Sequence, residues 1–146
     1  MALLNYSTGI SASKTAAEIQ VILAKAKARA VATEYNDAGR PVALAFQVNT
    51  PFGMQQFCLP VNADAVFAVL VRDKVTPKFR TRDHAEKVAW RILKDWVEAQ
   101  LAIVAAQMVT LDQVMLPYLQ TDDGATLYDR YVDQRQRALE ASNGSH

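Results

Sequence analysis

The side chains whose types and spacing could act on a ligand are concentrated in one basic run. Eight of the sixteen Lys and Arg residues lie within the 23 positions from Arg72 to Lys94, against three acidic residues. Such an excess of positive charge suits a phosphate backbone, and the start of a helix adds free N–H groups that attract anions. The candidate phosphate contacts are Arg72, Lys74, Lys78, Arg80, Arg82, Lys87 and Arg91. The alternative interpretation is an ordinary solvated charged surface.

Flat rings would complete an interface for single strands, because single-stranded nucleic acid is bound by cations that follow phosphates and aromatics that stack on bases. Phe52 and Tyr6 are the rings that we expect to be exposed. Phe46 and Phe57 fit a core better, because they alternate with polar residues in expected strands. If the helices pack against the sheet, we expect the aromatic rings of the strands and their turn to lie near the basic run.

The histidines and the cysteine predict no catalytic centre. With only His84 and His146 in the chain, no metal site built on paired histidines is expected. His84 belongs to the polar stripe of an expected helix, where it would meet solvent or phosphate. Cys58 lies in an expected strand with no neighbouring base and fits a small buried hydrophobe.

The acidic residues and the glycines likewise carry no recognisable chemistry. Asp122 and Asp123 precede Gly124 in an expected turn, and no third carboxylate stands at a spacing that would hold magnesium. The chain has no glycine-rich phosphate loop. We therefore expect no enzymatic activity, no metal and no cofactor.

A long helix expected from Thr81 to Met108 positions the basic run. Its apolar residues form two adjacent stripes at 100° per residue, which leaves a narrow polar sector for the cations. From Ala99 onward, only Gln100 and Gln107 are polar. A helix this apolar is expected between two layers or between two copies of the chain, so we predict a homo-oligomer.

The rest of the chain predicts an α+β fold, with a small antiparallel three-stranded sheet packed by helices. Alternating residues indicate strands near 31–36, 42–49 and 54–61, with a reversal at 50–53. Helices are expected at 15–27, from the capping residue Asn62 to about 72, from 110, and at 126–141. The cations Lys25, Lys27 and Arg29 are explained by the dipole at the end of the first helix. The division is an arm at 1–14, a domain at 15–120, and a C-terminal helix and tail at 121–146.

Bulk properties narrow the class of protein. A length of 146 residues is enough for one domain with a real core, and the net charge of +1 does not favour nucleic acid over other partners. One cysteine excludes an internal disulfide and fits a reducing compartment. No run approaches the roughly 20 apolar residues of a membrane span, and no signal peptide is recognised. The expected location is the cytoplasm.

Whole segments of the chain resemble a widespread group of small phage and prophage proteins. The likeness covers about residues 13–119 and is carried by Arg40-Pro41-Val42-Ala43, by FCLPVN at 57–62, and by VAWRILKDWVEAQLAIVAAQMVTLDQVMLPY at 88–118. Members are similar to single-stranded DNA-binding proteins of phage replication and recombination. The resemblance therefore implies sequence-independent binding of single-stranded DNA in the cytoplasm of a host cell.

The resemblance also implies a fold of the K-homology type, here with a long central helix and a helical C-terminus. In that fold a Gly-x-x-Gly loop between consecutive helices clamps the nucleic-acid backbone. This chain has no glycine between Arg72 and Asp83, and four cations stand there instead. Side-chain cations would then replace backbone amides as the phosphate contacts.

Two other functions fit parts of the sequence. A protein-interaction module, such as a phage inhibitor of a host factor, would use the apolar half of the long helix or the weakly charged face of the sheet. A helix-turn-helix regulator of double-stranded DNA fits less well, because the connection between the consecutive helices is longer than the usual 3–4 residues of that motif and contains Pro77.

Overall fold

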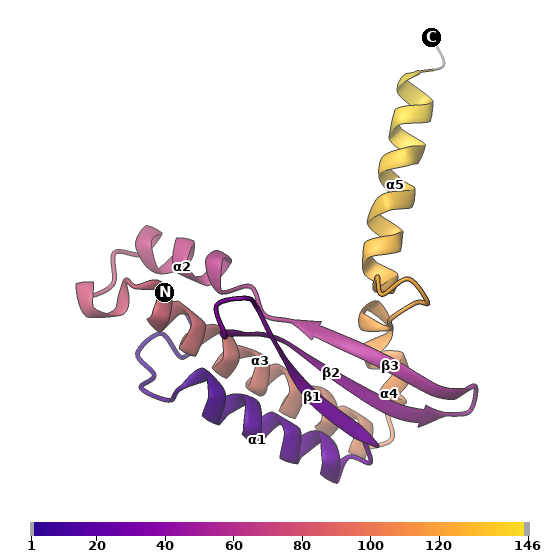
Figure 1. Cartoon of the computed structure of the whole chain (residues 1–146), viewed down its shortest axis with the longest axis horizontal. Coiled ribbons are helices and arrows are strands. Elements are labelled where there is room, and N and C mark those ends of the chain that lie inside the picture. The colour runs from indigo at the N-terminus through magenta and orange to yellow at the C-terminus, as the bar shows by residue number, and fades with distance from the viewer. Residues whose placement is uncertain (1, 145–146) are drawn as a thin grey trace.

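The computed structural model describes residues 2–144. Figure 1 shows a helix, a three-stranded sheet, two consecutive helices and a helical C-terminal part. The elements are α1 (Ala12–Lys25), β1 (Ala30–Tyr35), β2 (Pro41–Thr50), β3 (Gly53–Pro60), α2 (Ala63–Arg72), η1 (Pro77–Phe79), α3 (Arg82–Ala105), α4 (Leu111–Met115), η2 (Leu116–Tyr118) and α5 (Leu127–Asn143). The α+β class and the antiparallel sheet predicted from the sequence are confirmed.

The sheet is an antiparallel meander in the order β1-β2-β3. Thr50 pairs with Gly53 across a two-residue turn, and Gly53 adopts the positive φ of 102° that glycine tolerates best. Phe46 pairs with Phe57, and both rings are buried on the face toward the helices. The alternation in the sequence therefore placed the core side of the sheet correctly.

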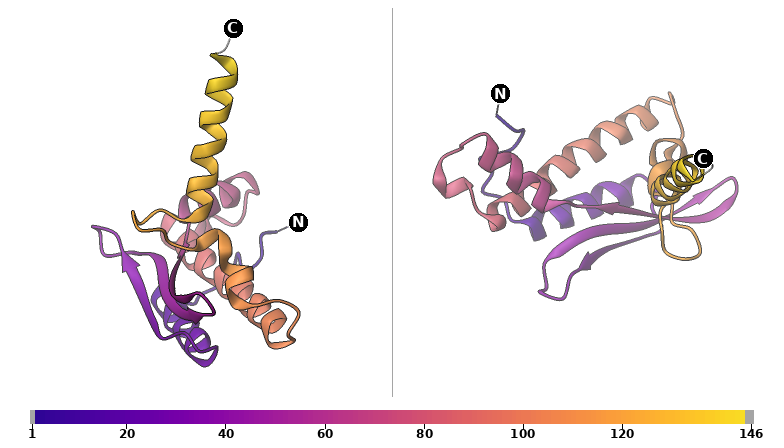
Figure 2. Two further views of the ribbon diagram at one scale, coloured as in Figure 1. Left: turned by 90° about the vertical axis from the view of Figure 1, so that its right-hand side faces the viewer. Right: turned by 90° about the horizontal axis from the view of Figure 1, so that it is seen from above.

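Helices α1 and α3 lie side by side and cover one face of this sheet, whereas the other face is open (Figures 1 and 2). The core between the two layers includes Ile19, Leu44 and the fully buried Trp90. The Trp90 indole N–H donates to the Pro41 carbonyl at 3.1 Å, so its one polar group is satisfied inside the core.

The long helix is shorter than predicted. Thr81 caps its start, but α3 ends at Ala105 instead of at Met108. Part of the apolar surface on the second half of α3 is covered by another segment of the same chain. The short helix α4 contacts α3, and Met115 at the end of α4 is completely buried. Met108 remains 72% exposed. The chain thus covers part of the apolar surface that the sequence assigned to a neighbouring layer or copy.

The first helix begins earlier than predicted. Ser11 is its N-cap and accepts a hydrogen bond from the Lys14 amide at 3.1 Å. The predicted cap, Thr15, is instead a buried residue one turn inside α1. The predicted start of this helix at Thr15 was therefore wrong, because α1 begins at Ala12.

The C-terminal helix α5 rises from the body of the molecule, and none of its residues is buried (Figure 1). Thr126 and Asp129 cap its start reciprocally. The end of the predicted tail, residues 145–146, lies outside the described residues. In the part of the chain that the structure describes, no helix is long and apolar enough to cross a membrane.

Candidate nucleic-acid interface

The predicted site is built on the connection between α2 and α3, residues 73–81, which we call the linker. Asp73 caps the end of α2, and Lys74 follows with a positive φ of 53°. The Lys74 amide donates to the Val71 carbonyl at 3.1 Å, and the Phe79 amide donates to Thr76 at 2.8 Å within η1. The linker therefore has a defined backbone shape, although it contains no glycine.

Phe79 attaches the linker to its surroundings. Its ring is stacked on the His84 imidazole with centroids 4.7 Å apart, and Tyr6 packs against it edge-on at 5.9 Å. The His84 Nε2 lies 2.5 Å from the Tyr6 carbonyl. Because a carbonyl only accepts, His84 must donate from this nitrogen. The N-terminal arm, the linker and the start of α3 thus meet at one cluster.

Two sequence predictions are corrected by this cluster. His84 is 7% exposed and hydrogen-bonded, so it does not lie on a solvated polar stripe. Tyr6 lies beside the linker as predicted, but its ring is half-buried against Phe79 instead of free for stacking. Phe79 was not among the predicted site residues. No periodicity indicates its role, because its partners Tyr6 and His84 come from two other segments, the N-terminal arm and the start of α3.

Three cations of the linker are exposed and form no ion pair within residues 2–144: Lys74, Lys78 and Arg80. We call them the linker cluster. The Lys78 ammonium lies 4.9 Å from the centroid of the Phe79 ring, a cation–π contact that leaves its charge uncompensated. These three residues come from a stretch of seven positions whose backbone is ordered by hydrogen bonds.

Two arginines that flank the linker are neutralised by carboxylates but remain exposed. Arg72 contacts Asp73 at 3.2 Å, and its side chain is 73% exposed. Arg82 pairs with Asp64, and its guanidinium lies 4.9 Å from the centroid of the Phe67 ring. Ion pairs this exposed are worth little, about 0–1 kcal/mol, so a phosphate could replace either carboxylate.

Lys87 and Arg91, the two predicted phosphate-binding residues farther along α3, both form ion pairs within the protein. Lys87 pairs with Asp83 one turn earlier at 3.7 Å. Arg91 donates to Glu18 of α1 at 2.7 Å, and its side chain is only 16% exposed. The hydrogen bond from Arg91 lowers the pKa of the Glu18 carboxyl. Lys94 reaches the same carboxylate at 3.5 Å. Arg91 therefore joins α3 to α1, and its burial argues against a phosphate contact.

The structure separates Phe52 from the linker. Phe52 is 84% exposed at the turn between β2 and β3, as predicted, but that turn lies at the opposite end of the molecule from the linker (Figures 1 and 2). Phe46 and Phe57 are stacked in the core with centroids 5.4 Å apart. The expectation that these rings lie near the basic run was wrong, because the sheet runs lengthwise away from the linker.

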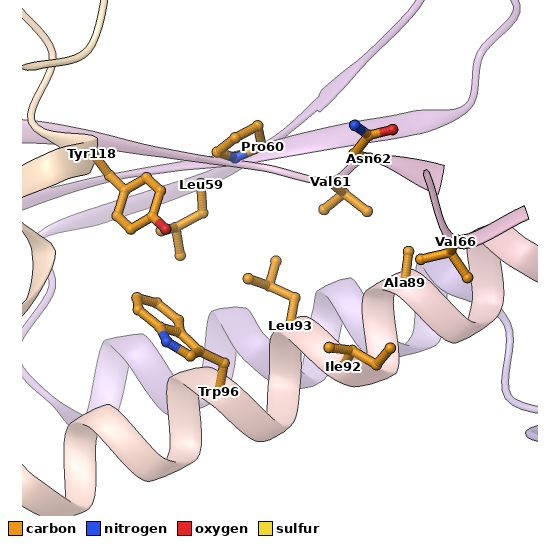
Figure 3. A pocket seen from close by; sticks show the side chains of 10 residues that line it. All are labelled: Leu59, Pro60, Val61, Asn62, Val66, Ala89, Ile92, Leu93, Trp96 and Tyr118. Carbon is orange, nitrogen blue, oxygen red and sulfur yellow. The ribbon is translucent and has the colours of Figure 1, made fainter. Parts of the chain in front are cut away.

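An apolar cleft of about 280 Å³ lies between α3 and the end of β3 (Figure 3). Ile92, Leu93 and Trp96 of α3 face Leu59 and Val61 across it. The remaining lining residues are Pro60, Asn62, Val66, Ala89 and Tyr118, so no charged side chain lines the cleft. It is unsuited to phosphate and suited to an apolar group.

The other candidate residues for chemistry are engaged in local structure. Asp123 accepts hydrogen bonds from Thr121 and from the Ala125 amide and pairs with Arg130, and these contacts lower its pKa to about 2. Burial raises the pKa of the Cys58 thiol, which is partly buried on the open side of the sheet. Among the described residues, no three His, Cys, Asp or Glu side chains are grouped as a metal site would require.

Comparison with known proteins adds no relative: no protein-family model, no curated protein and no solved structure matches this chain. The likeness to the phage proteins and to the K-homology fold stays a prediction from the sequence.

Proposed function

We propose that this protein binds single-stranded DNA without sequence preference and performs no chemistry on it. The observation that carries the proposal is the linker cluster. Lys74, Lys78 and Arg80 are exposed, carry no ion pair within residues 2–144 and lie on one short segment of fixed shape. Cations of this kind neutralise phosphates whatever the base sequence. The resemblance to phage proteins supports the same function, in replication or recombination within the host cytoplasm.

The contacts of Phe79 give the linker cluster a physical advantage. A segment whose shape is set before binding loses less conformational entropy when a ligand arrives. Arg72 and Arg82, beside the cluster, would add phosphate contacts by exchanging their exposed carboxylate partners. Lys87 and Arg91 are left out of the proposed surface, because α3 and α1 engage them.

Binding can be tested by fluorescence anisotropy with a labelled oligo-dT at a series of salt concentrations. For single strands, the logarithm of the affinity should fall with the logarithm of salt by about 0.7 per neutralised phosphate. Lys78→Gln with Arg80→Gln should lower the affinity about tenfold at 0.1 M salt and reduce this slope by about 1.4. The melting temperature should not change, because both side chains are exposed.

The matched control is Arg135→Gln with Arg137→Gln on α5, which changes the net charge equally at a distance from the linker. The proposal requires that this control binds like the unaltered protein. Binding that ignores salt, or no binding at micromolar protein, would refute single-strand binding as the function.

A second candidate function, binding of a host protein, is favoured by exposed apolar side chains on α5. Tyr128, Tyr131 and Leu139 are 56%, 59% and 63% exposed on a helix with no partner among the described residues beyond its base. Tyr131→Ala with Leu139→Ala should abolish capture of a partner from nuclease-treated host lysate and leave oligo-dT binding unchanged. Capture that disappears with nuclease would instead reflect nucleic acid.

We also propose that the protein forms a homo-oligomer, which would present several linker clusters to one strand and raise the affinity by multivalency. The exposed Met108 at the end of α3 and the apolar residues of α5 are the surfaces that support it. Light scattering of the purified protein measures the mass directly, and a monomeric mass at micromolar concentration would reject the oligomer.

A further inference from the structure

The ion pairs divide the sixteen Lys and Arg residues into two equal groups. Eight pair with carboxylates: Arg40, Arg72, Arg82, Lys87, Arg91, Lys94, Arg130 and Arg137. Over residues 2–144 the other eight form no such pair: Lys14, Lys25, Lys27, Arg29, Lys74, Lys78, Arg80 and Arg135. Three of these make up the linker cluster. Three others, Lys25, Lys27 and Arg29, occur together at the last residue of α1 and in its connection to β1, and we call them the turn cluster.

The helix dipole does not explain the turn cluster. Only Lys25 belongs to the last turn of α1, because the helix is capped by Ala26. Lys27 and Arg29 lie beyond the helix, where the favourable interaction with the dipole fades. All three side chains are exposed. The interpretation of these residues as dipole partners therefore holds for Lys25 alone.

The backbone of the turn is fixed as firmly as that of the linker. The Ala28 amide donates to the Leu23 carbonyl at 3.0 Å, and the Arg29 amide donates to the Gln47 carbonyl of β2 at 2.8 Å. Lys27 has a φ of 75°, and Lys74 of the linker cluster has a φ of 53°. In both clusters, a lysine occupies the left-handed position after a helix end, where glycine is the usual residue.

The β2–β3 turn, which contains Phe52, lies at the same end of the molecule as the connection from α1 to β1 (Figures 1 and 2). Its amide donates to the Thr50 hydroxyl at 3.1 Å, and that hydroxyl donates to the Gly53 carbonyl at 2.9 Å. An ordered turn thus holds an 84% exposed phenyl ring in solvent. The flat ring is therefore accessible for stacking on a base.

The open face of the sheet connects these features. β1 contributes the exposed Ala30 and Ala32 to this face, and β2 contributes Ala43 and Ala45, which are only 7% and 8% exposed. A shallow depression of about 230 Å³ borders it. Beside the alanines, the Gln47 amide donates to Gln56 at 3.2 Å, and the Gln56 amide donates to Gln120 at 2.6 Å. Glu34 is the one acidic residue of the three strands.

We propose that the turn cluster and Phe52 form a second contact surface for single-stranded nucleic acid, with the cations on phosphates and the ring on a base. This inference rests on the proposed function for its ligand class but uses residues at the other end of the molecule. Cations beside a stacking ring are the combination that single strands require. The linker end has cations without a free ring, and this end has both.

The first test compares three variants, each of which removes two exposed positive charges. Their affinities are measured by fluorescence anisotropy with labelled oligo-dT at 0.1 M salt. Lys27→Gly with Arg29→Gln should weaken binding about tenfold and lower the salt slope by about 1.4. Lys78→Gln with Arg80→Gln is the linker variant, and Arg135→Gln with Arg137→Gln is the control. Lys27→Gly keeps a backbone that glycine adopts easily, so the variant should remain folded.

The pattern of losses separates the two proposals. Loss in both cluster variants supports both surfaces. Loss in the linker variant alone overturns the second surface and leaves the proposed site. Loss in the turn variant alone supports the second surface and overturns the linker as the site. No loss in either variant overturns both.

The second test addresses the ring. Phe52→Leu keeps apolar bulk but removes the flat surface, and it should weaken oligo-dT binding about fivefold or more. Phe52→Trp should bind at least as tightly as the unaltered protein. Because the side chain is 84% exposed, both variants should melt like the unaltered protein. Equal affinity of all three proteins would show that the ring makes no stacking contact and would overturn its part of the proposal.

Discussion

The phenyl ring of Phe79 is stacked 4.7 Å from the imidazole of His84, with 29° between the two planes. This contact joins the linker to the first turn of α3, and the Tyr6 carbonyl holds the other side of the imidazole. The shape of the linker therefore depends on contacts of Phe79, His84 and Tyr6 and not on its cations.

Phe79→Ala should loosen the linker without removing any cation. We expect the free energy of unfolding to fall by about 1–3 kcal/mol, less than for a fully buried phenylalanine, because the ring is half-buried. Affinity for oligo-dT should fall several-fold, since Lys78 and Arg80 lose their fixed backbone. Denaturant unfolding and anisotropy measure the two effects. Unaltered affinity would mean that the linker needs no preorganisation.

Lys74→Gly separates charge from stability at the linker. Lys74 has a φ of 53°, a conformation that is unfavourable for side chains with a Cβ atom and accessible to glycine. The substitution should leave the free energy of unfolding unchanged or raise it by up to about 1 kcal/mol. It should nevertheless weaken oligo-dT binding by removing one phosphate contact. Parallel loss of stability and affinity would contradict this assignment.

Arg91 and Arg80 should respond in opposite ways to the same substitution. Arg91→Gln removes the shorter of the two cationic contacts to Glu18, leaving Lys94 at 3.5 Å, and should lower the melting temperature with little effect on oligo-dT binding. Arg80→Gln should do the reverse, because Arg80 is exposed and has no carboxylate partner within residues 2–144. Thermal melts and anisotropy on the two single variants decide between these roles. If both variants lost oligo-dT affinity equally, Arg91 would have to be counted among the residues that contact nucleic acid.

The turn before α5 should be sensitive to acid. Hydrogen bonds from Thr121 and Ala125 lower the pKa of Asp123 to about 2 from 3.8. A lowered carboxyl pKa contributes stability above the unfolded value and loses it as pH falls. The melting temperature should therefore drop between pH 4 and pH 2, and Asp123→Asn should flatten that dependence. Identical pH profiles for both proteins would show that Asp123 does not contribute.

Local patterns in the sequence were sufficient for the elements and for the core face of the sheet. Alternation from Val42 to Val48 and from Gln55 to Val61 predicted a meander whose inner side carries Phe46 and Phe57. These patterns work because a strand turns successive side chains to opposite faces whatever its partners are. Helix starts were less certain: the first helix was predicted to start at Thr15, whereas the structure caps it at Ser11.

The candidate site depended on the tertiary structure. Seven cations at 72–91 look alike in the sequence, yet Arg91 is held by Glu18, which lies 73 positions away, and Lys74, Lys78 and Arg80 are not paired with a carboxylate in residues 2–144. The turn that carries Phe52 lies away from the linker, because the β2–β3 hairpin extends to the other end of the fold (Figure 1).

Residue types and periodicity therefore settled which segments form helices and strands and which side chains can meet phosphate at all. Which cations lack a carboxylate partner among residues 2–144, and at which end of the molecule the exposed ring of Phe52 lies, was decided only by the folded chain. The physical reason is that charge pairing and stacking act over a few ångströms in space, between segments whose separation along the chain carries no information about that distance.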